Sequence, residues 1–338
     1  MRTLSSPNGK YRIQSKIGSG KSAEVYLAYS QSTQQECAIK IIPKHSVIGK
    51  EARAAVQREC SILSKISHEN VIQYIDHFED AENNYLVTEY FQGITITERV
   101  NLVGSLDSAL VIKIFSQLCT IISFLHQNDV CHQNISPDNV LIDDSNTIKL
   151  IDFGAACNEV QSRTATDILI HASPPEVISG RFYVPSLVDS WQLGYFLFYV
   201  FTNDYPWHGI SVNNLTIPTL EIPPAIPEKV HTLLKSLLEI NPLRRYSVEQ
   251  ASSYYWLSRP ISRIKSSITF HSVMSPFLSS PNSPKVKVFS KPNNNIAKRH
   301  SVGLLSLSDT FPGGGKGEGN DTSPLIRKNR ILSSPTFQ

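Results

Sequence analysis

Apolar residues in the first third of the chain recur at the short spacing of strands, interrupted once by the spacing of a helix. The helical segment is 49–66, where Val56, Cys60 and Leu63 fall on one face. The strand-like segments around it are Tyr11–Ile17, Glu24–Tyr29, Glu36–Ile42, Val71–Phe78 and Tyr85–Glu89. We therefore expect a small β-rich lobe of five strands with one inserted helix, preceded by a flexible lead over residues 1–10.

The spacing of apolar residues changes after Leu106. Leucines and isoleucines over residues 110–125 recur every three to four positions, which predicts a long amphipathic helix with Ser105 or Asp107 as its cap. Further helix-like segments follow at 188–201, 230–238 and 248–255. We expect a second, larger and mainly helical lobe, so residues 11–257 form one α+β domain of two lobes.

Composition shifts sharply after Leu257. Residues 258–338 are rich in Ser, Pro, Asn and Gly and lack sustained periodicity, so they bury too little apolar surface to offset chain entropy and are predicted to be disordered. The chain has a formal net charge of +3, and Lys and Arg outnumber Asp and Glu only in this basic tail. Its Ser-Pro pairs are candidate phosphorylation sites. Residues 259–274 are either an inhibitory or calmodulin-binding segment or a solvated linker.

The cysteines and the apolar runs bear on the cellular compartment. The five cysteines form no C-x-x-C pair and sit among apolar neighbours, which favours buried reduced thiols over a metal site or disulfides and suits an intracellular, cytoplasmic protein. No signal peptide opens the chain, and the most apolar run, 195–201, is far shorter than the roughly 20 residues that span a bilayer. We expect no transmembrane segment. The scattered tail charges without aromatic interleaving argue against a nucleic-acid partner.

Two polar loops lie between apolar strand-like runs. The first loop is His132-Gln-Asn-Ile-Ser-Pro-Asp-Asn139, and the second loop is Asp152-Phe-Gly154. Strands on both sides would hold the polar side chains in place, and the acidic residue before Phe and Gly is a candidate cation ligand. The two loops resemble the H-R-D-L-K-P-E-N and D-F-G motifs of the eukaryotic protein kinase family. The resemblance covers residues 11–257 and implies a two-lobed protein-kinase fold.

Three features of the small lobe match that family in order along the chain. The run Ile17-Gly18-Ser19-Gly20 resembles the glycine-rich loop over ATP phosphates, although by itself it favours an ordinary glycine hairpin. Cys37-Ala38-Ile39-Lys40 resembles V-A-I-K, and Glu59 stands at the helix position whose carboxylate pairs with that lysine. The alternative is a solvated Lys and a solvated Glu on separate elements.

The resemblance implies a site for ATP and Mg²⁺. The residues implied to contact ATP are Ile17, Gly18, Ser19, Gly20, Val25, Ala38, Lys40, Glu89, Phe91 and Leu141, with Thr88 at the border of the pocket. Asn139 and Asp152 match the two magnesium ligands, and they offer the hard oxygen donors that Mg²⁺ prefers. Glu176 and Arg245 match a scaffold ion pair, and residues 241–256 most resemble the calmodulin-dependent and AMP-activated serine/threonine kinases.

The first loop departs from the family at the positions that act on the substrate. Asn134 replaces the catalytic Asp, and an amide cannot take up a proton near neutral pH. Ser136 replaces the Lys that helps to neutralise the transferring phosphoryl group. Gln133 replaces the Arg that docks an activating phosphate, and Leu169 replaces a Thr that contacts the loop.

These departures lead to two main hypotheses about function. Loss of a general base typically costs ~10²–10⁴ in rate, so the first is a catalytically impaired pseudokinase that binds ATP and Mg²⁺ and acts by conformation on a protein partner. The alternative is an active, slow protein serine/threonine kinase that transfers the ATP γ-phosphate to protein hydroxyls, because such transition states leave little covalent work for the protein. A third hypothesis makes the basic tail primary, as a substrate-like or anionic-surface-binding arm.

Overall fold

The computed structural model describes residues 2–20, 23–44, 49–158, 172–180, 182–207 and 219–258, with side chains in the helix Gly49–Leu63 described from Ala55 onward. The chain divides into two units, Met1–Ser266 and Ser267–Gln338, and the described residues all belong to the first. The predicted disordered tail, apart from Ser258, and the departure at Leu169 lie outside the described residues.

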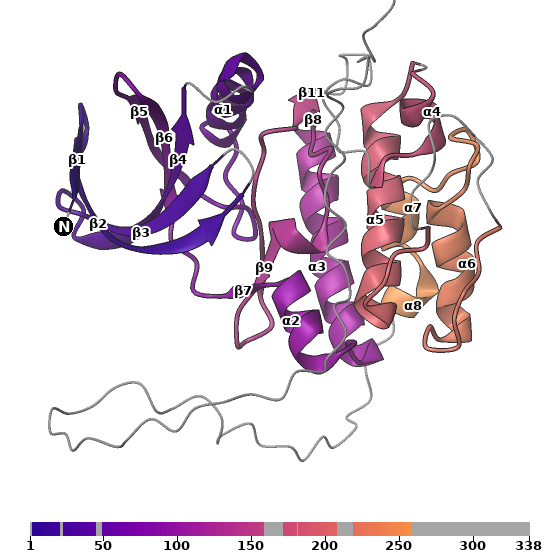
Figure 1. Ribbon diagram of the computed structural model, residues 1–338. Coiled ribbons are helices and arrows are strands. Elements are labelled where there is room, and N and C mark those ends of the chain that lie inside the picture. The colour runs from indigo at the N-terminus through magenta and orange to yellow at the C-terminus, as the bar shows by residue number, and fades with distance from the viewer. Residues whose placement is uncertain are drawn as a thin grey trace, which may run out of the picture. The chain divides into compact units, whose positions relative to one another are not determined.

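The small lobe is built on an antiparallel sheet of six strands in the order β1-β2-β3-β4-β6-β5 (Figure 1). The strands are β1 (Thr3–Ser6), β2 (Gly9–Ser19), β3 (Glu24–Ser30), β4 (Gln35–Pro43), β5 (Tyr74–Glu79) and β6 (Asn83–Glu89). On one face, Tyr11, Ile39, Phe78 and Tyr85 are part of a separate apolar cluster. The other face carries Lys40 and is turned toward the larger lobe, because Lys40 contacts Asp152 there.

The strand β1 corrects two expectations, the flexible lead and the count of five strands. β1 pairs with β2 along its whole length and buries Leu4. The Asp76 carboxylate on β5 accepts hydrogen bonds from the side chains of Ser6 and Asn8, both at 2.7 Å, and from the Tyr11 hydroxyl at 2.9 Å. A single apolar residue in a polar segment carries no periodic signal, so these contacts with a distant strand decide that the segment is ordered.

The helix α1 (Gly49–Leu63) connects the sheet to the core of the larger lobe. Val56 packs with Ile42 of β4, and Leu63 belongs to the large core cluster. The helix ends three residues earlier than the sequence predicts, and β5 begins three residues later. Between them, Val71 lies outside any strand and forms an isolated bridge with Leu150.

The larger lobe is mainly helical. Its helices are α2 (Ile96–Val103), α3 (Ser108–Gln127), α4 (Pro175–Ile178), α5 (Pro185–Thr202), α6 (Glu228–Leu237), α7 (Val248–Ser252) and α8 (Tyr255–Ser258). Short segments near the small lobe are β7 (Ile94–Thr95), β8 (Val130–Cys131), the 3₁₀ turn η1 (Pro137–Asn139), β9 (Val140–Ile142), β10 (Ile148–Leu150) and β11 (Cys157–Asn158). The strands β10, β9 and β7 form one small sheet, and β11 and β8 form another.

The centre of the larger lobe is the pair α3 and α5, which lie side by side (Figure 1). Of the two candidate caps for α3, Asp107 is the one that accepts from the backbone N–H groups of Ala109 and Leu110. By length and composition alone, α3 could cross a membrane, with a mean hydropathy of 1.8, and it is the one such helix among the described residues. Its apolar side chains, from Val111 to Leu125, pack in the core, which accounts for that composition.

Candidate functional site

The site is organised around the ammonium group of Lys40 on β4. Its Nζ lies 2.9 Å from a carboxylate oxygen of Glu59 on α1 and 2.7 Å from Oδ1 of Asp152, which follows β10. Three segments that are far apart in the chain therefore meet at one cation. The alternative of a solvated Lys and a solvated Glu on separate elements is wrong, because Glu59 is only 3% exposed and bonds directly to Lys40.

The charges of Lys40 and Asp152 stabilise each other. Burial alone would lower the pKa of Lys40, but the carboxylates of Glu59 and Asp152 outweigh it and raise that pKa. Burial alone would raise the pKa of Asp152, but Lys40 outweighs it and lowers that pKa. Lys40 is therefore held as a cation and Asp152 as an anion at neutral pH. An ammonium and a carboxylate so placed are suited to phosphate oxygens and to a divalent cation, respectively.

The helix α1 also holds the second loop from behind. The other carboxylate oxygen of Glu59 accepts from the backbone N–H of Phe153 at 3.0 Å, and the Arg58 guanidinium donates to the carbonyl of Gly154 at 2.7 Å. Asp152 has a φ of 64°, in the left-handed region that a residue without glycine's freedom rarely adopts. These contacts offset the backbone strain that turns the Asp152 carboxylate toward Lys40.

The two loops are tied to each other through Asn139. Its side-chain amide nitrogen donates to the carbonyl of Asn134 at 2.9 Å, and its own carbonyl accepts from the N–H of Ile151 at 2.9 Å. The first contact uses the donor end of the amide, which leaves the amide oxygen as the cation-binding end. An amide oxygen on Asn139 and a carboxylate on Asp152 fit the oxygen donors that Mg²⁺ requires.

His132 supports the same junction from inside the larger lobe. Burial lowers the pKa of His132, which favours the neutral ring. Its Nδ1 accepts from the backbone N–H of Asn134 at 3.2 Å, so the proton is on Nε2, which lies 3.2 Å from the carbonyl of Ile151. The ring also packs edge-on against Phe153 at 4.7 Å. One neutral imidazole thus links the first loop to the second.

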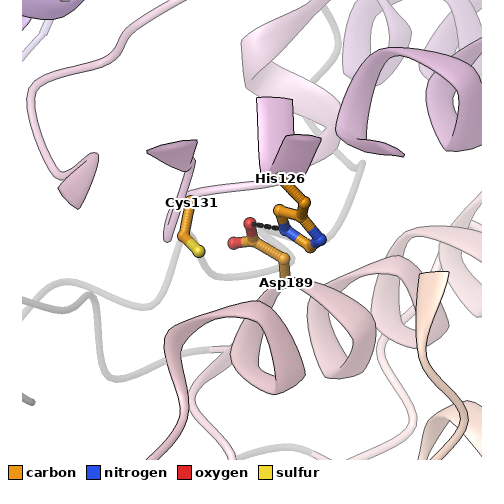
Figure 2. Close-up of side chains that lie close together, drawn as sticks. All are labelled: His126, Cys131 and Asp189. Carbon is orange, nitrogen blue, oxygen red and sulfur yellow. Dashed lines mark hydrogen bonds and ion pairs between the residues drawn. The ribbon is translucent and has the colours of Figure 1, made fainter. Parts of the chain in front are cut away.

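The backbone of the first loop is anchored on the buried carboxylate of Asp189 in α5. This carboxylate accepts from the backbone N–H groups of His132 at 2.9 Å and Gln133 at 2.7 Å. It also lies 2.9 Å from His126 Nε2 (Figure 2). His126, Cys131 and Asp189 place their ligand atoms within 4.8 Å of one another. Both oxygens of Asp189 already accept hydrogen bonds from the first loop, so this cluster serves as the anchor of that loop.

Gln133 is a buried part of this anchor. Its φ is 63°, its side chain is fully buried, and its amide nitrogen donates to the carbonyl of Pro185 at 2.7 Å. Gln192 on α5 brackets the loop, accepting from the N–H of Ile135 at 2.8 Å and donating to the carbonyl of Gln133 at 2.9 Å. The loop is held by neutral amides around one carboxylate. Gln192 belongs to no pattern that predicts this role, and it lies three residues after Asp189 on α5.

The residues expected around the adenine and phosphates share one face of the sheet. The register pairs Val25 with Lys40 and with Gly18, and it pairs Ala38 with Thr88. Register partners project on the same side, and so do residues two apart on one strand. The face that carries Lys40 thus also carries these expected pocket residues. Of the other expected contacts, Ile17 is exposed, Gly20 donates its N–H to the carbonyl of Ala23 at 2.8 Å, and Leu141 lies on β9.

The segment that joins the lobes is held on both sides. Glu89 donates its backbone N–H to the carbonyl of Gln73 at 2.9 Å, so only its carbonyl oxygen can face an adenine edge. Its carboxylate pairs with the Lys149 ammonium on β10, an interaction between segments sixty residues apart that no local pattern indicates. The Lys149 ammonium also lies 6.0 Å from the centre of the Phe91 ring. Gly93 comes next in this segment. A Cβ atom added at this position would lie 2.6 Å from the carbonyl oxygen of Ile142.

The predicted scaffold ion pair is present inside the larger lobe. Arg245 donates to the two carboxylate oxygens of Glu176 at 2.6 Å and 3.0 Å, and both residues are buried. The guanidinium also lies 4.9 Å from the Trp191 ring centre and donates to the carbonyl of Leu187 at 3.0 Å. This network fixes the short helix α4 against α5 and supports the loop anchor.

Comparisons with known proteins agree on one family. The protein kinase domain model matches residues 11–257. The chain is 30% identical over 268 residues to CBL-interacting serine/threonine-protein kinase 19 of Arabidopsis thaliana, an alignment that covers 76% of this chain and 55% of that protein. The chain is also 30% identical over 268 residues to CBL-interacting serine/threonine-protein kinase 12 of Arabidopsis thaliana. That alignment covers 76% of this chain and 54% of that protein.

A fungal relative is covered more fully. The chain is 28% identical over 255 residues to Aurora kinase of Schizosaccharomyces pombe, which covers 74% of this chain and 72% of that protein. By contrast, the chain spans about half the length of the two Arabidopsis proteins. The shared region is therefore the two-lobed part that contains the cluster around Lys40.

Proposed function

This chain belongs to the serine/threonine protein kinase family, and we propose that it binds ATP with Mg²⁺ while being impaired in phosphoryl transfer. The observation that carries the proposal is a contrast between neighbouring parts of one site. The Lys40–Glu59–Asp152 cluster is assembled, with both contacts to Lys40 under 3.0 Å, yet Asn134 stands where the family has its catalytic carboxylate.

The nucleotide-binding part of the proposal rests on the cluster at Lys40. In this role Lys40 binds the phosphates, and Glu59 keeps its ammonium in place. Asn139 and Asp152 would hold Mg²⁺, which when bound neutralises charge on the phosphates. Ala38, Val25 and Leu141 would enclose the base, and the carbonyl of Glu89 would face its edge.

The impairment rests on the charges that the first loop lacks. Asn134 can orient a hydroxyl group but cannot accept its proton. Ser136 offers no cation to the transferring phosphoryl group. Loss of such a cation by itself typically costs ~10²–10³ in rate. Gln133 has no charge to dock a phosphate, and its amide is already bonded to Pro185. The first loop is thus held in place without phosphorylation but lacks groups that act in the transition state.

Thermal unfolding of the purified full chain tests nucleotide binding. ATP with Mg²⁺ should raise the melting temperature of the parent protein, because a ligand that binds only the folded state stabilises it. Lys40→Met and Asp152→Asn should each remove that rise. Lys235→Met, at an exposed position of α6, is the matched control and should keep it. A parent protein that shows no rise at millimolar ATP and Mg²⁺ is incompatible with the proposal.

A second candidate function is slow serine/threonine phosphorylation. It is favoured by the intact frame of the first loop, in which the Asn134 carbonyl still accepts from the candidate cation ligand Asn139. Positioning and a cation alone accelerate phosphoryl transfer. Transfer of labelled phosphate to a generic peptide, compared with an Asn134→Asp, Ser136→Lys double variant, separates the candidates. Equal rates would favour the slow enzyme and count against impairment.

The narrower assignments follow from the same family membership. We place the chain with the calmodulin-dependent and AMP-activated group on the resemblance of residues 241–256, and inside the cell on its reduced cysteines. The domain proper would be residues 11–257, with the remaining tail as an appended segment. A regulated protein partner, recognising the nucleotide-bound form, would give an impaired enzyme its output.

A further inference from the structure

Two buried cysteines lie directly opposite each other beside the candidate site. In the small sheet formed by β8 and β11, Cys131 is the register partner of Cys157. Their exposed fractions are 0% and 2%. Cys131 directly precedes the first loop, and Cys157 lies three residues beyond the second. Figure 1 shows the two short strands together at one end of the larger lobe.

The antiparallel register brings the two thiols within bonding reach. Directly opposed residues project on the same face, with Cα atoms ~4.5 to ~5.5 Å apart. A disulfide accepts Cα separations of ~4.4 to ~6.8 Å, so this pair can close with little backbone movement. The other cysteines are Cys37 on β4, Cys60 on α1 and Cys119 on α3, and none of them has a cysteine as register partner in the described sheets.

We propose that Cys131 and Cys157 form a reversible disulfide when the protein meets hydrogen peroxide. One thiolate attacks a peroxide oxygen, the O–O bond breaks, and the sulfur becomes a sulfenic acid as the first water leaves. The second thiol then attacks that sulfur, the S–S bond forms, and the second water leaves. The two thiols lose two electrons and two protons, and one hydrogen peroxide is reduced to two waters. This step does not depend on the proposed nucleotide binding.

The bond would tie together the bases of the two loops. It closes a covalent ring over residues 131–157, which contains both candidate cation ligands, Asn139 and Asp152. A cross-link that fits the native geometry restricts the unfolded chain more than the folded one. The oxidised protein should therefore melt at a higher temperature than the reduced protein, with Asp152 still facing Lys40.

Burial governs how fast the reaction occurs. Buried thiols react slowly, so the peroxide must reach this pair through local opening. The strand β11 has two residues and, among the strands that the structure describes, pairs only with β8, so separating it breaks a short ladder and not the whole lobe. Cys37 is buried within the long strand β4, between β3 and β6, and lacks such a route. The proposal therefore predicts selective oxidation of Cys131 and Cys157 over Cys37.

Peptide mapping of the full chain tests the proposal. The reduced protein is treated with hydrogen peroxide, its remaining thiols are alkylated, and it is digested without reductant before mass spectrometry. We expect a linked pair of peptides containing Cys131 and Cys157, lighter by two hydrogen atoms than the separate peptides and lost on treatment with dithiothreitol. The melting temperature should rise on oxidation and return on reduction.

Variants assign the change in melting temperature to this pair. Cys157→Ala should abolish both the linked peptides and the rise, while Cys37→Ala, at an equally buried position, should leave both unchanged. The parent protein decides the matter even if Cys157→Ala fails to fold. Two unmodified thiols, or two separately oxidised ones, would overturn the proposal. Oxidation that links the pair but lowers the melting temperature would overturn its stabilising role.

Discussion

The side-chain amide of Asn139 donates a hydrogen bond to the backbone carbonyl of Asn134 at 2.9 Å. Asn139, a candidate cation ligand, thus positions Asn134, which stands where the family has its catalytic base. The contact is with the main chain of Asn134. The side chain at position 134 takes no part in this contact. The loop can therefore keep its shape whichever side chain stands there, and position 134 can be changed without dismantling the site.

Restoring the family's residues should raise phosphoryl transfer. We expect the double variant Asn134→Asp, Ser136→Lys to transfer phosphate to a peptide ~10²–10⁴ faster than the parent, the range that a general base supplies. The melting temperature should change little, because the loop is anchored to Asp189 through the backbone N–H groups of His132 and Gln133, which the two substitutions leave in place. Initial rates with labelled ATP measure the effect. Asn134→Ala is the control, and it should gain nothing.

Removing the Gln133 amide should loosen the first loop. Gln133→Ala deletes the donor to the Pro185 carbonyl and to Asp189 inside the larger lobe. A buried acceptor left without its partner costs ~1–3 kcal/mol, so we expect a loss of unfolding free energy of that order in urea titration. Gln127→Ala, at an exposed position near the end of α3, should leave the unfolding free energy unchanged. Equal stability of the two variants would contradict the anchoring role of Gln133.

Removing one partner of the buried Arg245–Glu176 ion pair should cost more unfolding free energy than removing one partner of an exposed ion pair. Arg245→Met leaves the Glu176 carboxylate buried without its bidentate partner, which typically costs ~3–5 kcal/mol of stability. The double variant Arg245→Met, Glu176→Gln should recover part of that loss, since it removes the unpaired charge. The matched control is Lys16→Met, whose pair with Glu24 is exposed and should give no measurable change in urea unfolding.

The Asp76 carboxylate should make the small lobe sensitive to acid. Burial alone would raise the pKa of Asp76, but hydrogen bonds from Ser6, Asn8 and Tyr11 outweigh it and hold the pKa below its usual value. A carboxyl whose pKa is lowered by folding contributes its full stability above the unfolded pKa of ~4 and loses it as the pH falls through the folded value.

Melting curves recorded between pH 7 and pH 2 test this dependence. Asp76→Asn should be less stable than the parent at neutral pH, and the difference between the two proteins should shrink below pH ~4 as the parent carboxyl takes up its proton. Asp144→Asn, a change in the turn between β9 and β10 outside the small lobe, should track the parent across this range. A constant difference between Asp76→Asn and the parent over the whole range would contradict the assignment.

The local sequence accounts for much of the site because motif spacing follows secondary structure. Lys40 and Glu59 are nineteen residues apart, and the periodicity of the intervening segment already places them on a strand and a helix. Short apolar runs mark where the first loop ends and where the second loop begins, and these runs become β9 and β10. The chemistry missing at Asn134 is visible in the sequence for the same reason, since a side chain's capacity to accept a proton does not depend on the fold.

Contacts between distant segments were decided only by the tertiary structure. The ordering of β1 depends on Asp76, about seventy residues away, and the position of the first loop depends on Asp189 and Gln192 of α5. The juxtaposition of Cys131 and Cys157 depends on a register between two strands of two residues each, too short to leave a pattern. Side-chain chemistry and short-range periodicity are properties of the local chain. Which carboxylate, amide or thiol lies opposite another is set by packing across the lobes, and no local spacing encodes it.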